Sequence, residues 1–87
     1  MKKIEIYTTP TCWYCRQAKA LLDNKGARYI EHDATTRELR VEARERSGRR
    51  TVPQIFIDGE SIGGYDDIQA LEDAGALDKK LGLGDSN

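Results

Sequence analysis

The stretch TPTCWYCRQAKALL, residues 9–22, holds both cysteines of the chain and decides how the rest is interpreted. Cys12 and Cys15 stand three positions apart, directly after KIEIYT (residues 3–8), whose alternation predicts a strand. From Tyr14 onward apolar residues recur at helical spacing, so the pair falls at the first turn of a helix. Two thiols so close can ligate a metal, close a disulfide or carry out redox chemistry.

The position of Cys12 favours redox chemistry. Unpaired amides and the positive end of the dipole at a helix N-terminus favour an anion, and the thiolate is the reactive form of cysteine. We therefore expect Cys12 to be the nucleophile. We expect Cys15, deeper in the first turn, to be less exposed and to attack a mixed disulfide formed on Cys12. One C-x-x-C without a second pair falls short of a structural zinc site, so we expect no metal.

Length and composition indicate a small soluble protein. The chain has 87 residues, of which 38% are hydrophobic and 33% charged, enough for one domain. Its net charge of −1 argues against a general nucleic-acid binder. No apolar run approaches the roughly 20 residues of a membrane span, and no signal peptide is recognisable. The sequence therefore predicts a protein of the cytoplasm, a compartment in which structural disulfides are uncommon.

The charge is distributed unevenly along the chain. One short window holds six arginines: Arg37, Arg40, Arg44, Arg46, Arg49 and Arg50. We interpret most of them as a solvated helix face interleaved with Glu38, Glu42 and Glu45. The alternative is that Arg49 or Arg50 reaches a small anionic ligand.

Four further elements follow the first helix. ARYIEHD (residues 27–33) predicts a strand, and TTRELRVEARERSG (residues 35–48) predicts a helix with Thr35 and Glu38 as its capping box. The run 55–57 predicts a strand covered on both faces. Asp58-Gly59 predicts a tight hairpin turn into a short strand.

The last part of the chain predicts a third helix in YDDIQALEDAG, with Asp66 and Gln69 as a capping box, and then one more short helical turn. The order β-α-β-α-β-β-α predicts an α/β fold. Its core is one mixed four-stranded sheet with helices on both faces. We expect the domain to span residues 1–82, with residues 83–87 as a frayed tail.

The sequence resembles the glutaredoxins, specifically the small dithiol bacterial type. The likeness covers nearly the whole chain: IEIYT, C-x-Y-C followed by AKALL, RSGRRTVPQIFIDG, IGGYDD and the closing GALD. The resemblance implies a thioredoxin fold, in agreement with the element order above.

The resemblance also implies a glutathione site beside the cysteines. It implies that Pro53 is cis, that the Val52 backbone pairs with the main chain of glutathione, and that Asp66 and Asp67 hold its γ-glutamyl end. Arg49, together with Gln54, would meet the glycyl carboxylate. The full implied set of glutathione-binding residues is Tyr14, Arg49, Thr51, Val52, Pro53, Gly64, Tyr65, Asp66 and Asp67.

Two positions depart from the family pattern. Trp13 stands between the cysteines where the commonest motif has proline, and Thr9 stands where members usually carry a lysine. That lysine helps to hold the thiolate and the glycyl carboxylate, and we expect Lys19 or Arg16 to replace it only partly. Trp13 is either a docking aromatic for partners or a tolerated surface substitution.

Three functional hypotheses remain. The first is a monomeric, glutathione-dependent oxidoreductase that reduces disulfide-containing or glutathionylated proteins through Cys12 and Cys15. The second is a dimer that binds a [2Fe–2S] cluster through Cys12 of each chain and two glutathiones. The third is a redoxin reduced by thioredoxin reductase.

Overall fold

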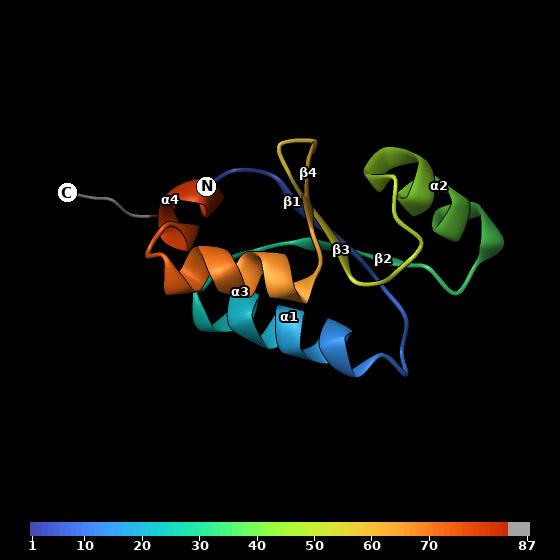
Figure 1. Cartoon of the computed structure of the whole chain (residues 1–87), viewed down its shortest axis with the longest axis horizontal. Helices are drawn as coiled ribbons and strands as arrows, with labels where there is room; N and C mark the ends of the chain where they lie inside the picture. The colour runs from blue at the N-terminus through green and yellow to red at the C-terminus, as the bar shows by residue number, and fades with distance from the viewer. Residues whose placement is uncertain (84–87) are drawn as a thin grey trace.

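The computed structural model describes residues 1–83 and contains eight elements in the predicted order, the short last helix included (Figure 1). They are β1 (Ile4–Thr8), α1 (Trp13–Asn24), β2 (Ile30–Asp33), α2 (Arg37–Ser47), β3 (Gln54–Ile57), β4 (Glu60–Gly63), α3 (Tyr65–Asp73) and α4 (Leu77–Leu81).

The strands form one mixed sheet in the order β2-β1-β3-β4. β1 runs parallel to β2, as expected for strands joined by a helix, and antiparallel to β3. β3 and β4 form the antiparallel hairpin that Asp58-Gly59 predicted. Both turn residues have positive φ, 51° and 84°, the geometry that a tight two-residue turn requires.

Helices cover both faces of the sheet, which confirms the predicted layers (Figure 1). α1 and α3 lie side by side on one face, and α2 lies on the other. The alternation of β1 sends Ile4 and Ile6 into the core beneath α1 and α3, whereas Tyr7 packs with Phe56 and Ala43 beneath α2. Because both faces are covered, every residue of β1 is buried.

The cap of α2 lies one residue later than the sequence predicted. Thr36 is the N-cap, and its hydroxyl oxygen accepts from the Leu39 amide. Thr35 instead donates, through its amide and its hydroxyl, to the Asp33 carboxylate. The predicted Thr35–Glu38 capping box is therefore wrong. Gly48 ends the helix in the left-handed conformation, as predicted.

The predicted Asp66–Gln69 capping box of α3 is also wrong. Gly64 is the N-cap, and the Asp67 carboxylate accepts from its amide at 2.8 Å. Because Gly64 has no side chain, it cannot accept a hydrogen bond from the first-turn amides, and the Asp67 carboxylate is the side chain that caps this end of the helix. Gln69 instead bonds within the helix, to Asp73 and to the Tyr65 hydroxyl.

The C-terminal part of the described chain closes the core. Leu77 and Leu81 of α4 are fully buried, and the Lys2 amide donates to the Leu81 carbonyl. Leu83, which the sequence analysis assigned to a frayed tail, packs against this core. The remainder of that predicted tail, residues 84–87, lies outside the described residues. Among residues 1–83, no helix has the length and apolar character needed to cross a membrane.

Candidate active site

Cys12 is the N-cap residue of α1, at the place where the chain leaves β1. Its backbone is extended, with φ −89° and ψ 114°, so the side chain turns back over the first turn of the helix. The sulfur accepts a hydrogen bond from the Cys15 amide at 3.1 Å, and as a thiol it donates to the Val52 carbonyl at 3.6 Å. The sulfur therefore lies between a helix N-terminus and the segment before β3.

Cys15 is 1% exposed, whereas Cys12 is only partly buried, and both carry free thiols. Burial, together with the neighbouring Cys12 sulfur, raises the pKa of the Cys15 thiol well above its ordinary value. The two thiols are therefore unequal in the way that the sequence predicted: Cys12 is reachable and Cys15 is held protonated behind it.

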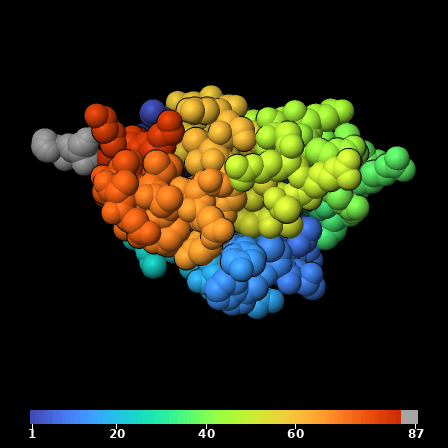
Figure 2. Space-filling model, viewed as in Figure 1, coloured from blue at the N-terminus to red at the C-terminus, as the bar shows by residue number. Residues whose placement is uncertain are grey.

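A groove of about 240 Å³ opens beside Cys12. The start of α1, the segment before β3 and the start of α3 meet around it on one face of the molecule (Figure 2). Its lining consists of Tyr14, Arg49, Thr51, Val52, Pro53, Gly64, Tyr65, Asp66 and Asp67. The structure thus brings together all nine residues that the resemblance implied for glutathione. The Val52–Pro53 bond is cis, as the resemblance implied.

One wall of the groove is held by Asp67. Its Oδ2 accepts from the Gly64 amide and lies 3.0 Å from Nη1 of Arg49. The Gly64 bond and the Arg49 guanidinium lower the pKa of this carboxyl. The sequence analysis assigned Arg49 and Asp67 to opposite ends of glutathione, whereas here the two side chains are in contact. Both are substantially exposed, so the ion pair is weak and can exchange for a ligand.

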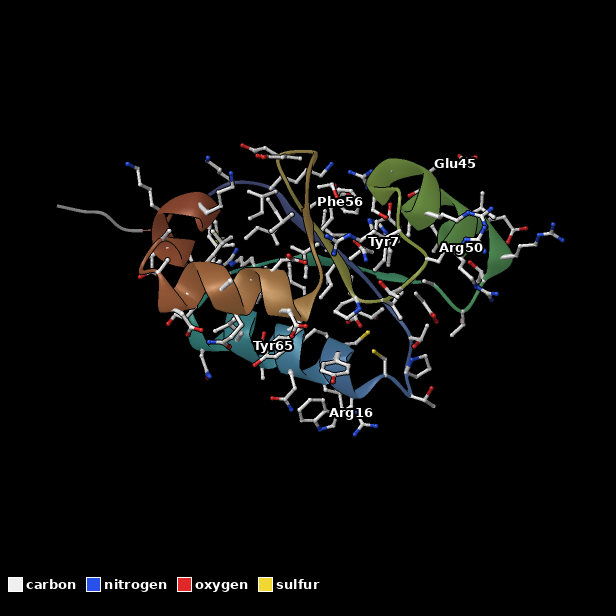
Figure 3. The ribbon with its side chains drawn as sticks, in the orientation of Figure 1. Tyr7, Arg16, Glu45, Arg50, Phe56 and Tyr65 are labelled. Carbon is white, nitrogen blue, oxygen red and sulfur yellow. The ribbon has the colours of Figure 1, made fainter. Side chains whose placement is uncertain are left out.

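Aromatic side chains form the outer edge of the groove. Trp13 and Tyr14 are 57% and 55% exposed and pack edge to face. The Tyr14 ring lies 6.3 Å from that of Tyr65, which Figure 3 labels near the start of α3. An exposed aromatic pair beside a reactive sulfur is an apolar surface that a partner can cover.

Other candidates have structural roles. Gln54 is fully buried, and its amide nitrogen donates to the Thr51 carbonyl and hydroxyl, so it positions Thr51 and does not line the groove. Lys19 pairs with Glu31 at 2.8 Å. Arg16, labelled in Figure 3, projects away from the molecule. His32 lies against the Tyr7 ring and contacts Glu5 at 3.1 Å, in keeping with a structural histidine.

The sequence did not indicate that Arg46, a partly buried residue of α2, packs against the sheet. Its guanidinium lies 4.0 Å from the Phe56 ring centre, and it contacts Glu5 at 3.0 Å and the Tyr7 hydroxyl at 2.8 Å. Glu5 and Arg46 are 41 positions apart, so no local pattern signals the contact. Arg46 attaches α2 to the sheet and is not part of the exposed arginine surface.

A partly exposed and a buried thiol at the start of the helix after β1, beside a cis proline, define a class of protein. That class is the thiol–disulfide oxidoreductases with a thioredoxin-like fold. Comparison with known proteins identifies the family within this class. The family profile described as glutaredoxin matches residues 4–62. Glutaredoxin 3 of Escherichia coli (strain K12) is 52% identical over 85 residues, which cover 93% of this chain and 99% of that protein. Glutaredoxin of Pseudomonas aeruginosa is 46% identical over 82 residues, covering 93% and 98%.

Solved structures agree. The solution structure of glutaredoxin from Brucella melitensis has a TM-score of 0.83 at 53% identity and covers 100% of this chain and 96% of that one. The crystal structure of a buckwheat glutaredoxin–glutathione complex has a TM-score of 0.85 at 29% identity, with 93% and 77% covered. The chain therefore belongs to the glutaredoxin family. It is a glutathione-dependent thiol–disulfide oxidoreductase with Cys12 and Cys15 as its C-x-x-C pair.

Proposed function

We propose that this glutaredoxin reduces protein disulfides and glutathionylated proteins, with Cys12 as nucleophile, Cys15 as resolving thiol and the groove beside Cys12 as the glutathione site. One observation carries the division of roles. Cys12 is reachable and accepts an amide hydrogen bond on its sulfur, whereas Cys15 is buried with a raised pKa. Of the two thiols, Cys12 is therefore the one that a substrate disulfide can reach.

The groove supports the assignment to glutathione through complementary chemistry. The Val52 carbonyl lies 3.6 Å from the Cys12 sulfur, so a tripeptide that places its own sulfur on Cys12 lies alongside the Val52 backbone and can pair with it as an added strand. The first-turn amides of α3 suit a carboxylate, the Asp66 and Asp67 carboxylates suit an ammonium, and Arg49 suits the second carboxylate. In the buckwheat relative, the solved complex contains glutathione.

The reaction proceeds by thiol–disulfide exchange. The Cys12 thiolate attacks the glutathione sulfur of a glutathionylated protein; a bond between the two sulfurs forms, the original S–S bond breaks, and the protein leaves as a thiolate that takes a proton. A second glutathione thiolate then attacks the sulfur of the bound glutathione, which releases oxidised glutathione and restores Cys12. With a protein disulfide, the Cys12 thiolate attacks one substrate sulfur and forms a mixed disulfide with it. Cys15 loses its proton and attacks the Cys12 sulfur, so the substrate leaves as a dithiol and a Cys12–Cys15 disulfide forms. Two glutathiones then reduce that disulfide and leave as oxidised glutathione.

Replacing each cysteine in turn tests these roles. Cys12→Ser is expected to abolish turnover of every substrate. Cys15→Ser is expected to retain turnover of a glutathionylated peptide and to lose most activity on an intramolecular protein disulfide, because that substrate alone requires the second thiol. The assay couples oxidised glutathione to glutathione reductase, and circular dichroism confirms that each variant is folded. A Cys15→Ser enzyme inactive on the glutathionylated peptide would contradict the assignment.

The same assay separates the reductants. We propose that glutathione is the physiological reductant and that the protein acts in the cytoplasm, a compartment in which thiols stay reduced. Exchange of glutathione and its reductase for thioredoxin reductase is expected to leave little activity. The cluster alternative has one accessible thiol per chain to draw on, because Cys15 is buried, and so requires two chains and two glutathiones. Reconstitution with iron, sulfide and glutathione that left a colourless monomer would dismiss it.

A further inference from the structure

A second cavity, of about 490 Å³, adjoins the glutathione groove between α2 and the segment that follows it. Five arginines contribute to its lining, and no acidic residue does: it is lined by Arg37, Arg40, Val41, Ala43, Arg44, Arg49, Arg50, Thr51 and Val52. Its volume lies within the range of ligand sites. The proposed reaction leaves it without a role.

α2 sorts its charges onto two sides. Arg37, Arg40 and Arg44 follow the i, i+3, i+7 spacing that keeps side chains on one stripe of a helix. Glu38, Glu42 and Glu45 follow their own i, i+4, i+7 stripe. In Figure 3 Glu45 is labelled at the upper edge of α2 and Arg50 below the helix. Arg37, Arg40 and Arg44 are exposed, as expected of a solvated helix face, and the glutamates lie on a separate stripe beside them.

The cavity arginines have unused capacity for anions. Within residues 1–83, neither Arg37, Arg44 nor Arg50 forms an ion pair with a carboxylate. Arg40 donates to the carbonyls of Ala34 and Thr35, which fixes it at the start of α2. Like charges gathered around one cavity repel one another, and a bound anion reduces that repulsion.

The cavity is continuous with the reactive site. It shares Arg49, Thr51 and Val52 with the glutathione groove, and the Val52 carbonyl contacts the Cys12 sulfur. The stripe from Arg37 to Arg44 covers seven residue-to-residue steps along the helix, about 10 Å, which matches the length of about three residues of extended polypeptide. That span exceeds a single inorganic anion. A polypeptide that presents its cysteine to Cys12 passes next to this stripe.

We propose that the arginine cavity docks an acidic segment of the protein substrate, a few residues from the cysteine whose disulfide is reduced. The inference rests on the proposed function, and it adds a preference among substrates that the cysteines and the glutathione groove do not provide. Because the chain as a whole has a net charge of −1, general attraction does not explain such a preference.

Matched glutathionylated peptides test this proposal. Each carries one cysteine with either three glutamates or three glutamines, placed two residues before or after it. Wild-type protein is expected to show a kcat/KM about eightfold higher for one of the glutamate peptides than for its glutamine counterpart, from about twofold for each of three exposed ion pairs. The advantage is expected to disappear at 0.5 M salt because such pairs are screened.

The variant Arg37→Gln/Arg44→Gln/Arg50→Gln is expected to lose the preference and to process the glutamine peptides as the wild type does. The control Lys2→Gln/Arg28→Gln/Lys79→Gln removes the same charge from exposed positions outside both cavities and is expected to keep the preference.

Equal rates for glutamate and glutamine peptides in the wild type, or equal losses in the two triple variants, would overturn the inference while the proposed function stands. Failure of the wild type on every peptide would overturn both. A dimer in sedimentation that only the cavity variant abolishes would assign the cavity to a second copy of the chain and reject the acidic substrate.

Discussion

Single residues fix the geometry around the reactive sulfur. The Cys12 sulfur is held by one amide of its own helix and one carbonyl of the opposite segment. The groove wall depends equally on one carboxylate, because Asp67 both caps α3 at Gly64 and holds Arg49. Sites held by so few contacts are sensitive to changes at the residues that shape them.

Gly63 illustrates that sensitivity. Its φ is 122°, where side chains are rarely found, and a Cβ at this position would collide with the Asp67 carboxylate. Gly63→Ala is therefore expected to cost about 2–3 kcal/mol in the free energy of unfolding and to raise the KM for glutathione, because the carboxylate must move. Urea unfolding and steady-state kinetics measure the two effects.

Gly48→Ala is the matched control for that substitution. Gly48 has a φ of 75°, but a Cβ there meets nothing within 4 Å. It is expected to cost only about 1 kcal/mol, the conformational penalty alone, with an unchanged KM. If both variants lose the same stability and keep the same KM, Asp67 does not shape the groove as described.

At the scale of elements, local patterns predicted what local interactions determine. Asp58-Gly59 fixed the hairpin, and Gly48 fixed the end of α2, because positive φ is a property of single residues. The caps were harder. Thr35 and Thr36 are adjacent and chemically alike, and the local pattern does not show which of them caps the helix. The Asp33 carboxylate, two residues before Thr35, accepts from Thr35 and leaves Thr36 as the cap. The N-cap of α3 is Gly64, which has no side chain, so the capping carboxylate comes from Asp67 within the helix.

The contacts between elements were not predictable, because they join residues far apart in sequence. The Glu5–Arg46 contact is the clearest case, and the arginine cavity is another, since its lining comes from α2 and from the segment after it. The nine residues that line the groove beside Cys12 were named through the family resemblance. The position of the two cysteines at the start of a helix predicted their unequal exposure.

Glu5 joins β1 to α2 and makes stability depend on pH. Its side chain is 10% exposed, and hydrogen bonds from Arg46, then His32, lower its pKa from 4.5 to about 2. A lowered pKa contributes stability that is complete above about pH 4.5 and is lost as the pH falls toward 2. Glu5→Gln is expected to lose roughly 2 kcal/mol at pH 7 and to approach the wild type in stability near pH 2.

Denaturant unfolding at several pH values between 2 and 7 measures this difference. Glu45→Gln, a change at an exposed glutamate of α2, is expected to follow the wild-type curve at every pH. If the Glu5→Gln and wild-type curves ran parallel through the acid range, the carboxylate would not be the group that links α2 to the sheet.

At the scale of the whole molecule, α4 connects the end of the described chain to its beginning. The helix lies beside the N-terminus, the Lys2 amide donates to the Leu81 carbonyl, and Leu77 and Leu81 enter the core that α1, α3 and the sheet share (Figure 1). A five-residue helix is unstable alone, so its stability comes from this packing. α4 should therefore unfold together with the sheet that positions Cys12.

Leu81→Ala tests whether the molecule is one cooperative unit. Leu81 is completely buried, so its truncation is expected to cost about 2–4 kcal/mol while unfolding remains a single transition by fluorescence and circular dichroism. Leu83→Ala, at a partly buried leucine just beyond α4, is expected to cost about 1 kcal/mol or less. The Cys12 reaction should be unchanged in both variants at temperatures where they are folded, because neither residue lines the groove.

If α4 were an accessory segment, Leu81→Ala would cost no more than Leu83→Ala, or an early transition would separate from the main one. The domain would then end before α4, at the C-terminus of α3.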